Sequence, residues 1–197
     1  MRRGNSIGDI YRRWPPSIVV VMAAAALTLP ASAQSPGSHR PPKTDPEMIA
    51  NAMSAGPPAV SRDATIIAMD GDKIRTLRKG SNEFTCVPDD PGSPGNDPMC
   101  LDKNAMEWLQ AWMDHKDAPK GKMGLVYMLQ GGSDASNDDP FATAPPAGKK
   151  WVTTGPHVMV VGMAGLLGNI PKSPDAPKLP FIMWGGTSYE HIMMPVK

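Results

Sequence analysis

Two short motifs in the C-terminal part of the chain place a methionine two residues after a histidine. One contains His157 and Met159, and the other contains His191 and Met193. Both lie in apolar stretches typical of β-strands, where residues two apart point to the same face. Each motif therefore presents an imidazole nitrogen beside a thioether sulfur. Soft sulfur combined with imidazole suits copper, and Cu(I) in particular.

A copper site built from these motifs requires two geometric conditions. The two strands must be neighbours in a register that puts both histidines on one face, because a slip of one residue sends one pair to the opposite face. The four ligand atoms must also come within reach of one ion, which we take to require the two histidines within about 12 Å of each other. The simpler interpretation is two core methionines, each near a hydrogen-bonded histidine.

An acidic segment suggests calcium as a weaker candidate ligand. Asp134, Ser136, Asn137, Asp138 and Asp139 place several oxygen atoms within six residues, as a hard cation such as Ca²⁺ prefers. The spacing is not that of an EF-hand, and no bidentate Glu follows at the right distance. A solvated turn with side-chain-to-backbone hydrogen bonds explains the same residues.

A hydrolase is the main catalytic alternative. His157 or His191 can be combined with Ser133 and Asp134 into a nucleophile, base and orienting acid. The chain nevertheless lacks a G-x-S-x-G elbow, a phosphate-binding glycine loop, a dinucleotide fingerprint and an H-E-x-x-H helix. We therefore expect a non-catalytic protein.

The chain has two cysteines, Cys86 and Cys100, which bracket a loop of aspartates, glycines and prolines. In an oxidising compartment an isolated pair of cysteines is expected to form a disulfide. Closing a loop of about 15 residues removes on the order of 3 kcal/mol of unfolded-state entropy. A thiolate metal pair is the alternative, but the spacing resembles no zinc motif.

The element that follows the second cysteine is the clearest helix, expected from about Asp102 to His115. Apolar residues recur on one face of it, and Trp108 and Trp112 lie four residues apart on that face. We expect the two indoles to dock the helix on a sheet, although a ligand-stacking role is also open. A shorter helix is expected over Pro46 to Ala55.

The other segments are interpreted mainly as strands and turns. Three short strands joined by tight turns are expected to form an antiparallel meander, and later strands end in a closing hairpin. The expected strands are 64–69, 73–77, 83–87, 124–129, 151–162 (interrupted near 155–156), 181–184 and 189–196. The predicted class is α+β, a largely antiparallel sheet with one long packed helix and several long irregular loops.

The first 33 residues are typical of a signal peptide. Four arginines precede an apolar run of about 12 residues, too short to span a bilayer, and a small-x-small cleavage signal ends at Ala33. We expect the mature chain to begin at Gln34, with residues 34–44 as a flexible linker and 45–197 as one globular domain. His39 in that linker is expected to be an incidental solvated side chain. The predicted location is periplasmic or secreted.

Composition limits the possible partners. Removal of the leader, with its four arginines and one aspartate, changes the net charge from +1 to −2. A near-neutral domain lacks the clustered basic charge that nucleic acid requires, and no later segment is apolar enough to span a membrane. Thirteen of the 15 methionines remain after removal of the leader. Methionine is a flexible filler of gaps in protein cores, and its sulfur is also a soft metal ligand.

Several phrases resemble a group of uncharacterised exported bacterial proteins. They are residues 84–89 (FTCVPD), 97–100 (DPMC), 131–137 (GGSDASN), 155–159 (GPHVM) and 189–193 (YEHIM). The resemblance covers most of the mature domain and implies export and a single domain, without an activity. We therefore expect an exported non-catalytic binding domain with copper as its specific ligand. The alternatives are a periplasmic hydrolase using His157 and a structural or protein-interaction module whose methionine-rich surface contacts a protein partner.

Overall fold

The computed structural model describes residues 39–71, 73–172 and 178–196. The predicted leader, the expected new N-terminus at Gln34 and the first part of the predicted linker lie outside these ranges. The described residues belong to one compact unit of the chain. No helix in this part of the chain combines the length and apolar character needed to cross a membrane.

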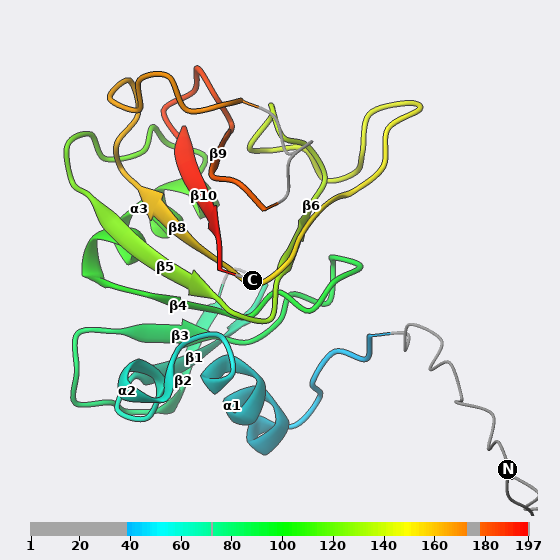
Figure 1. Cartoon of the computed structure of the whole chain (residues 1–197). Helices are drawn as coiled ribbons and strands as arrows, with labels where there is room; N and C mark the ends of the chain where they lie inside the picture. Colours follow the sequence, from blue (N-terminus) through cyan, green and yellow to red (C-terminus); the bar gives the residue numbers. More distant parts are fainter. Residues whose placement is uncertain (1–38, 72, 173–177, 197) are drawn as a thin grey trace, which may run out of the picture. The chain divides into compact units, whose positions relative to one another are not determined.

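The described residues form a mixed α+β fold in which strands dominate (Figure 1). The helices are α1 (Asp45–Met53), α2 (Pro58–Ser61) and α3 (Lys103–Met113). The strands are β1 (Thr65–Asp70), β2 (Lys73–Arg78), β3 (Thr85–Val87), β4 (Met99–Leu101), β5 (Gly124–Met128), β6 (Gly132–Asp134), β7 (Val152–Thr154), β8 (His157–Val161), β9 (Phe181–Met183) and β10 (His191–Pro195).

One sheet of eight strands organises the domain. Its order is β2-β1-β3-β4-β5-β8-β10-β9, and β6 pairs with β7 in a separate two-stranded sheet. Among the described pairings only β1 with β3 is parallel. The prediction of a largely antiparallel α+β fold is therefore confirmed, including the closing hairpin of β9 and β10.

Helices cover both faces of this sheet. Successive residues of a strand point to opposite faces, and Ile66 and Ile67 of β1 belong to two different apolar clusters. Ile66 packs in the cluster that contains Ala52 of α1, whereas Ile67 packs in the cluster that contains Trp108 of α3. The sheet thus separates a smaller core beneath α1 from a larger core beneath α3.

The predicted antiparallel meander is wrong in its third strand. β3 runs parallel to β1 and lies on the side of β1 opposite to β2. After β2 the chain crosses the start of β1, where Ser81 and Asn82 both donate to the Asp63 carbonyl at 2.8 and 3.1 Å. A Cβ atom at Gly80 would lie 2.2 Å from the Thr65 nitrogen. The crossing therefore depends on a glycine, whereas the sequence analysis expected a tight turn between the second and third strands.

The expectation of one long helix is not confirmed. α3 has 11 residues, and its end is set by His115, which adopts a left-handed conformation with φ of 52°. Its start is fixed by Asp102, whose carboxylate accepts hydrogen bonds from the Ala105 and Leu125 nitrogens at 2.8 and 3.0 Å. Trp108 is buried against the sheet, in agreement with the docking role expected for it.

The disulfide between Cys86 and Cys100 is present. The two residues lie directly opposite each other in the antiparallel pair of β3 and β4, in the core beneath α1. The bond therefore joins two neighbouring strands. The sequence interpretation placed Cys100 at the start of a helix, because the three residues of β4 are too few to give a periodic signal.

Candidate metal centre

The strands that carry the two His-x-Met motifs are neighbours. β8 and β10 pair antiparallel, and Met159 lies directly opposite Met193. All four side chains are buried on the face of the sheet that α3 covers, with exposed fractions of 1% for His157 and 1% for His191. The first geometric condition, neighbouring strands with both histidines on one face, is therefore fulfilled.

Both histidines have the same hydrogen-bonding geometry. His157 Nδ1 lies 2.7 Å from the carbonyl oxygen of Gly155, and His191 Nδ1 lies 2.9 Å from that of Tyr189. A carbonyl only accepts, so each Nδ1 carries the ring proton and each Nε2 is left with its lone pair. Within the described residues both buried Nε2 atoms have no hydrogen-bond partner. Two buried acceptors left unsatisfied in one core require an explanation.

Burial keeps these imidazoles neutral. It lowers the pKa of His191 to about 4, against the opposing effect of the bond to the Tyr189 carbonyl, and repulsion between the two imidazoles in their protonated forms lowers it further. Burial also lowers the pKa of His157. A neutral imidazole whose Nδ1 proton is held by a carbonyl is the form in which histidine offers Nε2 to a metal ion.

The spacing along the strands is less favourable. His157 lies opposite Pro195, so the register offsets the two histidines by four residues, which places their Cα atoms about 14 Å apart. The paired methionines lie between them. Measured between Cα atoms this exceeds our limit of about 12 Å, so the second geometric condition is not fulfilled, and the four side chains cannot all contact one ion without movement. Contact of one ion with the two methionines and a single imidazole requires less movement.

Two further methionines share this face, and sequence reasoning missed both. Met128 of β5 lies opposite His157, and Met183 of β9 lies opposite His191. A Cβ atom at Gly132 would lie 3.0 Å from Met128 Cε and 3.5 Å from His157 Cε1, so these two side chains converge there. The apolar strands 124–128 and 181–183 contained the signal, but only the strand order shows which methionine faces which histidine.

Aromatic rings enclose the His191 end of the face. The ring centre of His191 lies 5.0 Å from that of Trp184 and 5.5 Å from that of Trp108, both edge to face. The Trp108 indole N–H is also buried without a hydrogen-bond partner in the described structure. This end is therefore buried beneath α3 among aromatic rings, and such an apolar environment favours a soft, weakly hydrated ligand.

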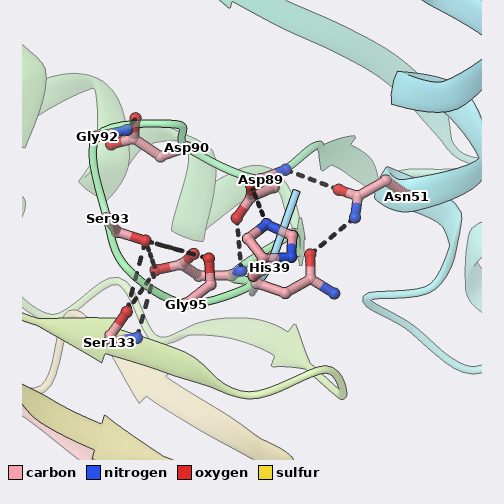
Figure 2. A network of polar contacts seen from close by, with 10 residues as sticks. His39, Asn51, Asp89, Asp90, Gly92, Ser93, Gly95 and Ser133 are labelled. Atoms are coloured by element: carbon pink, nitrogen blue, oxygen red, sulfur yellow. Dashed lines mark hydrogen bonds and ion pairs between the residues drawn. The ribbon is translucent and has the colours of Figure 1, made fainter. Parts of the chain in front are cut away.

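A separate cluster of carboxyl groups lies between the loop 88–98 and β6 (Figure 2). Asp97 accepts hydrogen bonds from the Ser93 hydroxyl at 2.7 Å and from the Ser133 nitrogen at 3.3 Å. Burial, together with a hydrogen bond and repulsion from Asp89, raises the pKa of Asp97 to about 6. Burial and the charge of Asp97 raise the pKa of Asp134 to about 7.

His39 joins this cluster, so its expected role as an incidental solvated side chain is wrong. Its Nε2 lies 2.6 Å from Asp89 Oδ2, and the Asp89 side chain is fully buried. The partner lies 50 residues away, and the composition of a proline-rich segment contains no signal for such a contact.

The residues considered for calcium are used in other ways. The Ser136 hydroxyl accepts from the Asp138 and Asp139 nitrogens at 3.1 and 3.0 Å, which is the turn geometry that explains such segments without a metal. Within the described ranges, no three side chains of His, Cys, Asp or Glu are arranged to hold a metal ion. Methionine sulfur, which characterises the His-x-Met face, is not among those ligand types.

The hydrolase arrangement is not formed among the described residues. The Ser133 hydroxyl bonds to Asp97 at 3.4 Å and to Ser93 at 3.5 Å, and not to a histidine. The ring of His157 contacts a backbone carbonyl through Nδ1 and no hydroxyl. A serine nucleophile requires a base within hydrogen-bond reach.

Comparisons of the chain with protein-family models, with curated proteins and with solved structures give no match. The assignment of a function therefore rests on the geometry of the residues.

Proposed function

We propose that this chain is an exported, non-catalytic binding domain that holds Cu(I) on the His-x-Met face. One observation carries the proposal. His157 and His191 are both buried and neutral, both have Nδ1 fixed by a carbonyl, and both direct an unpartnered Nε2 lone pair into a methionine-lined core. An unpaired buried acceptor costs about 1–3 kcal/mol, and a bound cation removes that cost at the imidazole that it contacts.

The chemistry of the donors favours a soft ion. Met159 and Met193 face each other at the centre, Met128 lies beside His157, and Met183 lies opposite His191. Thioether and imidazole ligands together select Cu(I) over hard cations, which prefer oxygen. We assign the central thioethers of Met159 and Met193 as ligands, completed by the imidazole of His157 or His191.

An anaerobic titration of the purified protein with Cu(I) against a chromophoric Cu(I) chelator tests this assignment. We expect one equivalent of Cu(I) to be retained. The Met159→Leu and Met193→Leu substitutions nearly conserve side-chain volume, and each should weaken binding at least about tenfold because it removes a ligand. Of the His157→Ala and His191→Ala substitutions, the one that removes the coordinating imidazole should weaken binding as well, and the other should not.

Matched controls separate ligand loss from a damaged core. Met106→Leu changes a methionine that is half buried against the same core but lies on α3, and it should leave the affinity unchanged. A His39 variant should also bind normally. Retention of no Cu(I) against the chelator, or equal affinity in the Met159→Leu, Met193→Leu and Met106→Leu proteins, would overturn the proposal. Two equivalents would instead indicate that each histidine binds with the methionine opposite it.

A further inference from the structure

The two ends of the His-x-Met face are covered differently. At the His191 end the indoles of Trp108 and Trp184 are stacked with ring centres 5.8 Å apart, and both residues are buried. At the His157 end the residue that lies against the face is Gly132 of β6, which has no side chain and is partly exposed. The cover over the buried donors is therefore thinnest at the His157 end.

Three side chains from different segments meet at Gly132. A Cβ atom at this position would lie 3.0 Å from Met128 Cε, 3.5 Å from His157 Cε1 and 3.8 Å from Asp97 Cβ. Nε2 of His157 is bonded to this Cε1, and within the described residues it has no hydrogen-bond partner. A thioether, a free imidazole nitrogen and a carboxyl group thus surround the space that a side chain would occupy in any other residue.

The carboxyl groups at this point lie beside the strand that carries Gly132. Asp97 of the loop 88–98 accepts from the Ser133 nitrogen at 3.3 Å (Figure 2), and Asp134 follows two residues after Gly132 on β6. Carboxylates attract a cation to the place where they gather. Oxygen is nevertheless a poor ligand for Cu(I) compared with sulfur and imidazole, so these groups attract the ion without retaining it.

From Gly132 the soft donors continue inward without interruption. Met128 lies opposite His157 across the pair of β5 and β8. Met159 follows His157 on the same face of β8, about 7 Å further along the strand, and it lies opposite Met193. Each donor therefore has another thioether or imidazole as its next neighbour on the way to the centre of the face.

We propose that Cu(I) enters and leaves the His-x-Met face at Gly132, where Met128 and His157 take up the ion and pass it to Met159 and Met193. The inference rests on the proposed function and adds the route by which that site is loaded. Only coordination bonds change along the route, since one thioether or imidazole donor replaces another and the ion remains Cu(I). The ring proton of His157 stays on Nδ1, where the Gly155 carbonyl holds it.

Release of Cu(I) from the loaded protein into a large excess of a chromophoric chelator, followed anaerobically by absorbance, tests the route, because entry and exit use the same path. Gly132→Ala puts a methyl group between Met128 and His157, where the closest atom is the flexible end of Met128. It should slow release at least about tenfold, since the methyl group raises the barrier to passage, and it should leave the equilibrium affinity unchanged. Met128→Leu nearly conserves volume. It should also slow release while one equivalent is still retained at equilibrium.

Two matched controls make the result specific. Gly155→Ala adds the same methyl group beside His157, where no atom lies within 4 Å of the new Cβ. Met183→Leu makes the same change as Met128→Leu at the His191 end. Both proteins should release Cu(I) at the wild-type rate.

The outcomes distinguish the route from the site. A protein that retains no Cu(I) at equilibrium refutes the proposed function and the route with it. Normal retention with wild-type release rates in the Gly132→Ala and Met128→Leu proteins overturns the route alone. Slower release in the Met183→Leu protein than in the Met128→Leu protein also overturns it, because the ion would then leave at the His191 end. If Gly132→Ala alters the affinity as well, the Met128→Leu protein decides.

Discussion

Replacement of Asp97 by Asn tests whether the carboxyl cluster stores a pH-dependent free energy. The Asp97 carboxyl accepts from Ser93 and Ser133 and lies beside Asp89. An asparagine has nearly the same shape, keeps one acceptor oxygen and is neutral at every pH. It therefore imitates the protonated form of Asp97 permanently.

The magnitude and sign follow from the raised pKa of Asp97. Its folded-state value is about 6, compared with 3.8 for the free residue, so the folded state binds more protons than the unfolded state between these values. Its stabilising contribution is complete below about pH 4 and is lost as the pH rises through about 6. Two pKa units correspond to about 3 kcal/mol. We expect about 1–2 kcal/mol, because solvent near the loop screens part of the effect.

Other groups titrate in the same range, so the wild-type profile alone is not diagnostic. The pKa of Asp134 is raised to about 7, and stability from that group also falls as the pH rises. The pKa of His191 is lowered to about 4 and that of His157 is lowered too, and stability from these groups increases as the pH rises toward 6.5. The opposing slopes partly cancel below pH 6.5.

The difference in free energy of unfolding between the Asp97→Asn and wild-type proteins isolates the contribution of Asp97. Urea unfolding followed by tryptophan fluorescence should give equal free energies of unfolding for the two proteins at pH 4. At pH 8 the Asp97→Asn protein should be more stable by about 1–2 kcal/mol. Asp138→Asn makes the same chemical change on an exposed side chain and should stay within about 0.5 kcal/mol of wild type at both pH values. A destabilised Asp97→Asn protein at pH 8 would refute the reasoning.

Two further predictions concern the fold. Replacement of both Cys86 and Cys100 by serine opens a loop with a sequence separation of 14 and should lower the free energy of unfolding by about 3 kcal/mol. Non-reducing peptide mapping of the parent protein should recover the two cysteine peptides joined to each other. A variant as stable as the parent would contradict this prediction. Gly80→Ala should be more destabilising than about 2 kcal/mol, because its Cβ atom would overlap the Thr65 backbone at 2.2 Å. The control Gly155→Ala has no atom within 4 Å of the new Cβ, and equal stabilities of these two variants in urea unfolding would argue against the crossing of β1.

Local sequence patterns were sufficient for the class of fold and for part of the site. Period-two alternation put His157 with Met159, and His191 with Met193, on common faces, since side-chain direction in a strand depends only on neighbouring residues. The two cysteines permitted only one intramolecular pairing. The helix that contains Trp108 was predicted from apolar spacing in the same way, although its length was not.

Features that join distant segments were decided by the tertiary structure. The parallel pairing of β3 with β1 depends on Gly80 passing the start of β1, and the short strand β4 gave no periodic pattern. The carboxyl cluster gathers His39, the loop 88–98 and β6, whose positions along the chain carry no information about their distance in space. Composition alone therefore classified the segment of His39 as a linker and the segment between the two cysteines as an irregular loop.

The candidate metal centre combines both kinds of information. The sequence by itself determined the two His-x-Met motifs and that the histidine and methionine of each share a face, because side-chain direction follows from local backbone geometry. The register between β8 and β10, the order of the methionines across four strands and the unpartnered Nε2 atoms were decided only by the folded structure. The physical reason is that register and burial are set by the summed packing of the whole core, so no segment contains them.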